Sequence, residues 1–193
     1  MRFASAALML CATAGASEAQ QKINRRSAMG PMASIRVMNL SGSVRVIGWD
    51  RDSLVVTGTM PDSAHFFYGA GANAAKMGVE VLGNAELKPV KLELRVPAGA
   101  RIWVKTGSAD IEVSGVTGGL DLNIVGGHIK VAGSPRELNA EAMDGSIEID
   151  GSPPWLRAKS ATGAITLKGS SDDAVFTTVS GTVTVPAGAR FER

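Results

Sequence analysis

Apolar residues recur with a fixed period of 18 along the second half of the chain. One column begins at Ile111 and a second follows two residues later at Val113, while another pair begins nine residues earlier at Ile102 and Val104. The first column reads Ile111, Ile129, Ile147, Ile165 and Val183. Within each pair the two apolar side chains point one way and the residue between them points the other, which predicts short strands with one buried face.

A repeat of this length indicates stacked structural units. We therefore predict an all-β fold, a parallel β-solenoid with 18-residue rungs and two short strands in each rung. The recurring motif G-x-I-x-V-x-G, as in residues 127–133 and, with isoleucine for the valine, in residues 145–151, places glycines where the corners between strands are expected. The outward column that begins Glu112, Lys130, Glu148 sets opposite charges on adjacent rungs, as a solvated register-setting ladder would.

The first 19 residues are typical of a secretory signal peptide. Arg2 precedes a small and apolar stretch, and Ser17-Glu-Ala19 fits a small-x-small cleavage site. An uncleaved membrane anchor and lipidation at Cys11 are the alternatives. Cys11 is the single cysteine, so the cleaved chain would hold no disulfide and no cysteine zinc site. The protein is expected to be exported to the periplasm, the cell surface or the medium.

The rest of the chain divides into a linker and one domain. Residues 20–32 are polar and unpatterned, which predicts a linker, and residues 33–193 form the solenoid domain, with an irregular insertion at 61–88. The motif V-P-A-G-A-R at 96–101 returns at 185–190, where three residues follow it instead of a strand. An open last edge of this kind predicts edge-to-edge self-association.

Net charge and hydropathy argue against nucleic-acid binding and against a transmembrane span. The formal net charge is +2, which offers no electrostatic footprint for nucleic acid. Although 45% of the residues are hydrophobic, the sequence contains no apolar run of the roughly 18 residues that span a bilayer. We therefore expect no transmembrane span once the signal peptide has been removed.

Three features of the chain go together: V-P-A-G-A-R at 96–101, T-G-S-A-D-I-E-V at 106–113 and the repeated G-x-I-x-V-x-G turns. In these motifs the chain resembles the bacterial putative-adhesin family, an exported β-solenoid domain of unknown function. The resemblance covers roughly residues 33–193. It implies a solenoid fold and a role in surface binding, and it transfers no catalytic residue to this chain.

The search for catalytic, cofactor and metal sites predicts none. Asp110, His128 and Ser146 follow one another in a single outward column, which is the composition of a catalytic triad. A flat, exposed strand surface, however, supplies neither a pocket nor an oxyanion hole. Calcium needs six to eight oxygen ligands, and the predicted corners carry only Asp144 and Asp150. The stretch G-A-G-A-N-A at 69–74 lacks the βαβ setting of a dinucleotide fingerprint.

Aromatic residues provide the candidate recognition patch: Phe66, Phe67, Tyr68, Trp103 and Trp155. The three consecutive aromatics in the insertion could bind a partner, cap the N-terminal edge of the solenoid or pack within a loop. Trp103 falls in an outward column, and Trp155 stands in a Pro-Pro-Trp run that predicts a loop. Exposed tryptophans stack on sugars, or they pack against loops.

These observations favour a non-enzymatic, adhesin-like protein of the cell envelope or cell surface that binds an unidentified protein or polysaccharide without a cofactor. One alternative is a polysaccharide-active β-helix enzyme, which would need clustered carboxylates in a groove. The outward columns carry scattered charges of both signs instead. Another alternative is an envelope scaffold that self-associates through its open edge.

Overall fold

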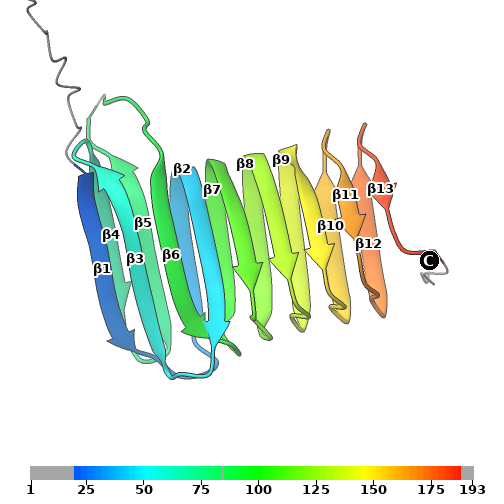
Figure 1. The fold of residues 1–193 in the computed structure, drawn as a ribbon, viewed down its shortest axis with the longest axis horizontal. Coiled ribbons are helices and arrows are strands. Elements are labelled where there is room, and N and C mark those ends of the chain that lie inside the picture. The colour runs from blue at the N-terminus through cyan, green and yellow to red at the C-terminus, as the bar shows by residue number, and fades with distance from the viewer. Residues whose placement is uncertain (1–19, 84, 188–193) are drawn as a thin grey trace, which may run out of the picture.

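The computed structural model describes residues 20–83 and 85–187, so the predicted signal peptide at 1–19 lies outside the described residues. The described chain is all-β, and it contains no helix long and apolar enough to cross a membrane. Its strands stand side by side in one long row (Figure 1). They are β1 (Gln20–Ala28), β2 (Ser34–Trp49), β3 (Ser53–Pro61), β4 (Ala64–Ala70), β5 (Ala74–Val81), β6 (Val90–Pro97), β7 (Arg101–Ser114), β8 (Gly119–Ala132), β9 (Glu137–Asp150), β10 (Trp155–Ser160), β11 (Ile165–Leu167), β12 (Asp173–Thr178) and β13 (Val183–Thr184).

The predicted fold class, a regular parallel β-solenoid with two short strands per rung, is wrong. The 13 strands belong to one mixed sheet whose main path runs β1-β3-β6-β2-β7-β8-β9-β10-β12, and that path has two free ends, so the sheet is open. Strands β2, β7, β8, β9, β10 and β12 pair in parallel, whereas β1 with β3, β3 with β6, and β4 with β5 pair antiparallel.

The antiparallel part has a simple physical cause. Only three residues, 71–73, separate β4 from β5, and a parallel pair would need a crossover connection of a dozen or more residues. The two strands therefore fold back as a hairpin, with His65 opposite Glu80 and Gly69 opposite Lys76. The 18-residue period begins only at residue 102, so it contained no information about this end of the sheet.

The register that the period predicts is confirmed. Ile111 pairs with Ile129, Ile129 with Ile147, and Ile147 with both Ile129 and Ile165 on the neighbouring strands. The two predicted short strands, however, are continuous in β7, β8 and β9, each of 14 residues. In β7 the buried positions are Ile102, Val104 and Thr106 and then, shifted by one residue, Ala109, Ile111 and Val113, because the pairing with β8 is interrupted at Gly107.

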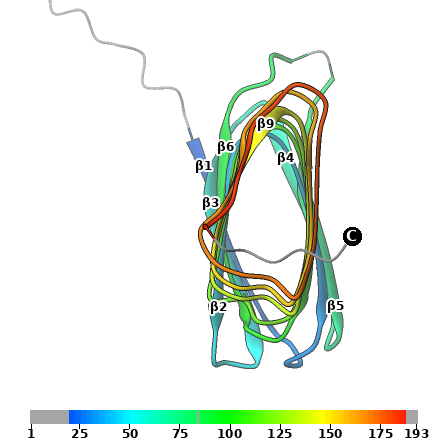
Figure 2. The ribbon, with the colours of Figure 1, turned by 90° about the vertical axis from the view of Figure 1, so that its right-hand side faces the viewer.

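Seen along the row of strands, the successive turns of the chain trace one narrow outline (Figure 2). The apolar columns of both strand halves lie within it and belong to one hydrophobic core, which includes Ile102, Ile111, Leu138 and Ile147. Gly145 sits where neighbouring turns pack closely, since a Cβ at this position would clash with the carbonyl oxygen of Gly127. Close packing of neighbouring turns, rather than a positive φ, therefore requires this glycine.

Two further predictions for the N-terminal half are wrong. The expected linker at 20–32 contains β1, which pairs with β3 along its whole length from Gln20 to Ala28. The insertion at 61–88, expected to be irregular, contains the hairpin β4–β5, and β5 extends the parallel sheet beside β2. Both segments bury apolar residues, among them Ile23 and Met77, so packing orders them despite their weak sequence pattern.

Candidate binding groove

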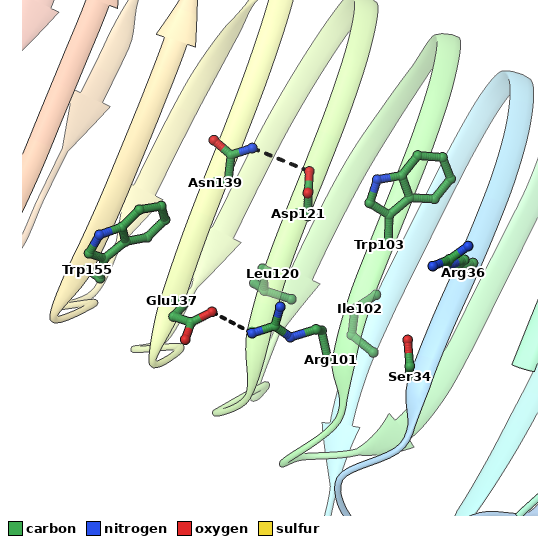
Figure 3. A pocket seen from close by; sticks show the side chains of 11 residues that line it. Ser34, Arg36, Arg101, Ile102, Trp103, Leu120, Asp121, Glu137, Asn139 and Trp155 are labelled. Carbon is green, nitrogen blue, oxygen red and sulfur yellow. Dashed lines mark hydrogen bonds and ion pairs between the residues drawn. The ribbon is translucent and has the colours of Figure 1, made fainter. Parts of the chain in front are cut away.

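An open groove of about 590 Å³ lies on the outward face of the sheet, across β2, β7, β8, β9 and β10. The strands present alternate side chains to this face and to the core, so the groove is lined by the residues between the buried apolar positions. Figure 3 shows Trp103 and Trp155 near its two ends, with Asp121 and Asn139 between them. The groove therefore has an aromatic side chain near each end and polar side chains along the floor between them.

The register of the parallel strands explains why the two tryptophans share one face. Trp103 pairs with Asp121, which pairs with Asn139, and Asn139 pairs in turn with Arg157. Trp155 stands two residues before Arg157, on the same side of β10. Three strand intervals separate β7 from β10, or about 14 Å across the sheet. A ligand that contacts both indoles must therefore extend across all three strand intervals.

The floor of the groove is low because β8 contributes a glycine at its first position. Arg101 on β7 passes above Gly119 and donates a hydrogen bond to the carboxylate of Glu137 on β9, with 2.7 Å between Nη2 and Oε2. A Cβ at Gly119 would lie 3.3 Å from Arg101 Nε. The missing side chain thus lets the guanidinium lie flat across a whole strand.

Asp121 occupies the middle of the groove and accepts hydrogen bonds from two amides. Asn123 Nδ2 lies 2.6 Å from Asp121 Oδ1, and Asn139 Nδ2 lies 3.4 Å from the same oxygen. Asp121 and Asn139 are half-buried and line the groove, so a carboxylate and an amide face it. Such groups both donate and accept hydrogen bonds, so the floor suits a ligand rich in hydroxyl groups.

Trp155 is held by an ion pair one strand further on. The guanidinium of Arg157 lies over the indole, 4.4 Å from the ring centroid, and forms two 2.9 Å hydrogen bonds with the Asp173 carboxylate. These hydrogen bonds lower the pKa of Asp173 below its ordinary value of 3.8 and raise the pKa of Arg157. Trp155 still exposes 37% of its surface, so part of the indole remains free for a ligand.

The consecutive aromatics of β4 divide between the two faces of the hairpin. Phe66 is buried and Tyr68 is half-buried with its hydroxyl 2.8 Å from Ser27 Oγ, so both help to pack the N-terminal end of the sheet. Phe67 lies over Gly78 on the outward face, where Lys76 Nζ is 5.9 Å from its ring centroid. Of the five predicted patch residues, Trp103 and Trp155 line the same groove, and Phe67 lies on the outward face of the β4–β5 hairpin next to β2.

Asp110, His128 and Ser146 do meet, but not as a triad. The imidazole Nδ1 of His128 lies 2.7 Å from Ser146 Oγ, whereas Asp110 accepts a hydrogen bond from the backbone N–H of His128. The carboxylate therefore does not orient the ring as a catalytic aspartate would. Within residues 20–83 and 85–187, no three histidine, cysteine, aspartate or glutamate side chains lie close enough together to hold a metal ion.

The predicted charge ladder forms with a different partner. Lys168 Nζ lies 2.7 Å from Glu148 Oε1, and this hydrogen bond, more than the charge of Lys130, lowers the pKa of Glu148. Glu112 instead approaches Arg45 on β2, at 3.6 Å. The charged pairs thus involve Arg45 and Lys168, two residues outside the column from which the ladder was predicted.

Sequence reasoning missed an apolar column at one corner of the sheet. Val125 and Met143 are 18 residues apart, and Val179 follows Met143 after 36 residues, with Ala161 between them. Val125, Met143 and Val179 expose 53%, 64% and 86% of their surfaces beside a second hollow of about 410 Å³. Their spacing is visible in the sequence, but a corner position breaks the strand alternation by which we assigned faces. All three side chains are among the exposed large hydrophobic residues of the described C-terminal half.

Comparison with known proteins gives likenesses in structure alone. No family model and no curated protein matches the sequence. A putative cell adhesion protein from Clostridium sporogenes is similar to the chain, with a TM-score of 0.47 and 9% identity over 86% of this chain and 99% of that one. A putative adhesin from Bacteroides fragilis has a TM-score of 0.34 and 13% identity over 88% and 99%.

A third neighbour carries another name. A putative lipid binding protein from Parabacteroides distasonis has a TM-score of 0.31 and 11% identity over 86% of this chain and 96% of that one. The adhesin names coincide with the family that residues 96–113 resemble. A TM-score below 0.5 with an identity near 10% transfers no function to this chain.

Proposed function

We propose that the protein is a non-enzymatic, exported protein of the cell envelope or cell surface that binds an extended polymer in the groove between Trp103 and Trp155. The observation that carries this proposal is the pairing of two accessible indoles with a polar floor on one open face. Indoles offer a large apolar area at low entropic cost, and the side chains between them offer hydrogen bonds.

A polysaccharide fits this groove better than a peptide strand. The central strands β7, β8 and β9 are paired on both sides, so their backbone groups are not available to add a further strand. Recognition must therefore use side chains alone. Sugar rings present an apolar face that stacks on an indole and hydroxyl groups that bond to Asp121 and Asn139.

Binding to insoluble polysaccharides, measured by co-sedimentation, tests the proposal. Trp103→Ala and Trp155→Ala should each reduce the bound fraction. Trp49→Ala serves as the matched control, because Trp49 stands at the far end of β2, with Nε1 bonded to the carbonyl of Ser53. Circular dichroism of each variant checks that it folds. Unchanged binding by both groove variants would contradict the proposal.

The polysaccharide-active enzyme remains the second candidate, because Asp121 and Glu137 place two carboxylates in the groove. Glycoside hydrolysis needs one of its two carboxyl groups to be a proton donor. Glu137 instead accepts a hydrogen bond from Arg101, and Asp121 accepts two from amides. Release of new reducing ends from a bound polysaccharide, lost in Glu137→Gln, would favour the enzyme.

The self-associating scaffold rests on two surfaces. Within the described chain, β12 pairs with β10 alone and β13 pairs with β11 alone, so both offer backbone groups to a further strand. The corner column of Val125, Met143 and Val179 adds exposed apolar area. A mass that rises with concentration in light scattering would favour this role, and a constant monomer mass would exclude it.

Export is also part of the proposal, and it rests on the signal-like residues 1–19. Protease treatment of intact cells, compared with opened cells, tests it. Digestion on intact cells would place the protein at the surface. Protection until the envelope is opened would place it in the periplasm, and a full-length protein in the cytosol would contradict export.

A further inference from the structure

The basic side chains around the groove differ in whether they are neutralised. Arg101 is paired with Glu137, and Arg157 is paired with Asp173. Arg36 on β2 lines the groove with an exposed side chain, and among the described residues it has no ion pair or hydrogen bond through its guanidinium. It is therefore available to an external anion.

A second exposed cation stands directly beside Arg36. The parallel register pairs Arg36 with Lys76 on β5 and with Trp103 on β7, so the three side chains form one row on the outward face. Lys76 contacts the ring of Phe67 and has no carboxylate partner among the described residues. The end of the groove next to Trp103 is thus both cationic and aromatic.

The opposite charge lies further along the same row. Asp121 follows Trp103 in the register, its hydrogen bonds come from neutral amides, and among the described residues it forms no ion pair with a cation. An anionic group would be repelled at Asp121 and attracted at Arg36 and Lys76. This arrangement gives the groove a direction, with the anion at the β5–β2 end and hydroxyl groups in the middle.

Resting on the proposed function, we infer that the ligand is a linear acidic glycan. Its sugar rings stack on Trp103 and Trp155, and a carboxylate or sulfate group of the glycan binds Arg36 and Lys76. The distance of about 14 Å between the strands of the two tryptophans requires an oligosaccharide or polysaccharide rather than a single sugar. Arginine suits both kinds of anion because its planar fork donates two parallel hydrogen bonds.

Paired polymers that differ only in charge test this inference. Polygalacturonate is compared with its methyl ester, and dextran sulfate with dextran, by isothermal titration calorimetry at low and at moderate ionic strength. The wild-type protein should bind one acidic member more tightly than its neutral partner. The preferred pair identifies a carboxylate or a sulfate as the group recognised, and added salt should reduce the preference because exposed charges are screened.

The variant Arg36→Gln/Lys76→Gln should lower affinity for the preferred acidic polymer by about tenfold, since two exposed ion pairs are lost. Its affinity for the neutral partner should not change. Lys130→Gln removes one positive charge from the other half of β8 and serves as the control, with little expected effect. Thermal melting of each variant confirms that the fold is intact.

The outcomes separate this inference from the proposed function. If acidic and neutral polymers bind equally and Trp103→Ala abolishes both, the groove binds glycans but the assignment of an acidic ligand is overturned. If Lys130→Gln weakens binding as much as the double variant, attraction is non-specific and the inference is also overturned. If neither member of either pair binds, or if binding ignores both tryptophans, the proposed glycan function fails as well.

Discussion

The guanidinium of Arg101 reaches the carboxylate of Glu137 across the full width of strand β8, with 2.7 Å between Nη2 and Oε2. This contact is possible because Gly119 places no side chain between them. Two residues that are 36 positions apart thereby close one side of the groove without filling it. The groove depends on this missing side chain as much as on its tryptophans.

Enlarging residue 119 should therefore close the groove. In Gly119→Leu the new side chain must displace Arg101 and occupy the floor, so we expect loss of polymer binding with the strands still formed. Gly119→Ala is the matched control, because its Cβ meets only the flexible end of Arg101. Affinity measured by calorimetry should fall strongly in the first and little in the second. Equal binding by all three proteins would contradict the assigned floor.

The core assignment is tested at Ile147, which is buried in the middle of the parallel strands and pairs with Ile129 and Ile165. Ile147→Asp places an unpaired carboxylate in the core and should cost about 3–5 kcal/mol of stability. Thr166→Asp, on an outward-facing position of β11, should cost little. Chemical denaturation followed by circular dichroism measures both. Similar stability for Ile147→Asp and the wild type would show that the inward face is wrongly assigned.

Close packing between turns is tested at Gly145. Its Cβ would meet the backbone carbonyl of Gly127, which cannot move aside as a side chain can, so Gly145→Ala should cost about 1–3 kcal/mol. Gly126→Ala is the control, since the nearest atom to its Cβ is a carbonyl oxygen at 3.5 Å, an ordinary contact. Thermal unfolding of the two variants should separate them clearly, and equal melting temperatures would argue against this cause.

The Arg157–Asp173 pair predicts a particular pH dependence. The pKa of Asp173 is lowered in the folded state, so the pair stabilises the protein above the ordinary value of 3.8 and loses this effect as the pH falls through the lowered value. The melting temperature of Asp173→Asn should therefore lie slightly below that of the wild type near pH 6. The two should converge at about pH 2. The difference should be small and should shrink in salt, because the pair is exposed.

A difference between wild type and Asp173→Asn that persists or grows in acid would contradict this account of the pair. The same variant also tests the support of Trp155, since Arg157 lies over the indole and is oriented by Asp173. Polymer affinity near pH 6 should fall by a few-fold in Asp173→Asn, because the support of Trp155 is lost while the setting of Trp103 is unchanged. The change in tryptophan fluorescence during titration with the polymer measures this affinity.

The sequence predicts the C-terminal half of the sheet better than the N-terminal half. The column that begins at Ile111 gives the parallel register correctly, because an 18-residue period and strand alternation both depend on local pattern. Strands β1 and β3 pair over 20–28 and 53–61 without any repeat, and long-range packing decides their partners. The two short strands of a turn were expected to be separated by a corner, whereas β7 runs through Gly107 as one strand although its pairing with β8 is interrupted there.

The groove could have been found from the same period. One outward column with the 18-residue interval contains Trp155 together with its neighbours in the groove. It reads Arg101, Gly119, Glu137, Trp155 and Asp173. The Pro-Pro-Trp run predicts a loop, whereas the structure makes Trp155 the first residue of β10. What the sequence could not provide is the geometry across strands, such as Arg101 passing above Gly119.

The central claim is that a polymer lies across the sheet and contacts both groove tryptophans. The chain has three tryptophans, Trp49, Trp103 and Trp155, so its indole N–H signals can be assigned from single substitutions and followed by NMR during a polygalacturonate or dextran sulfate titration. The account predicts that the Trp103 and Trp155 signals shift together with one affinity while the Trp49 signal stays in place. Shifts at Trp49 alone, or at only one of the groove tryptophans, would contradict it.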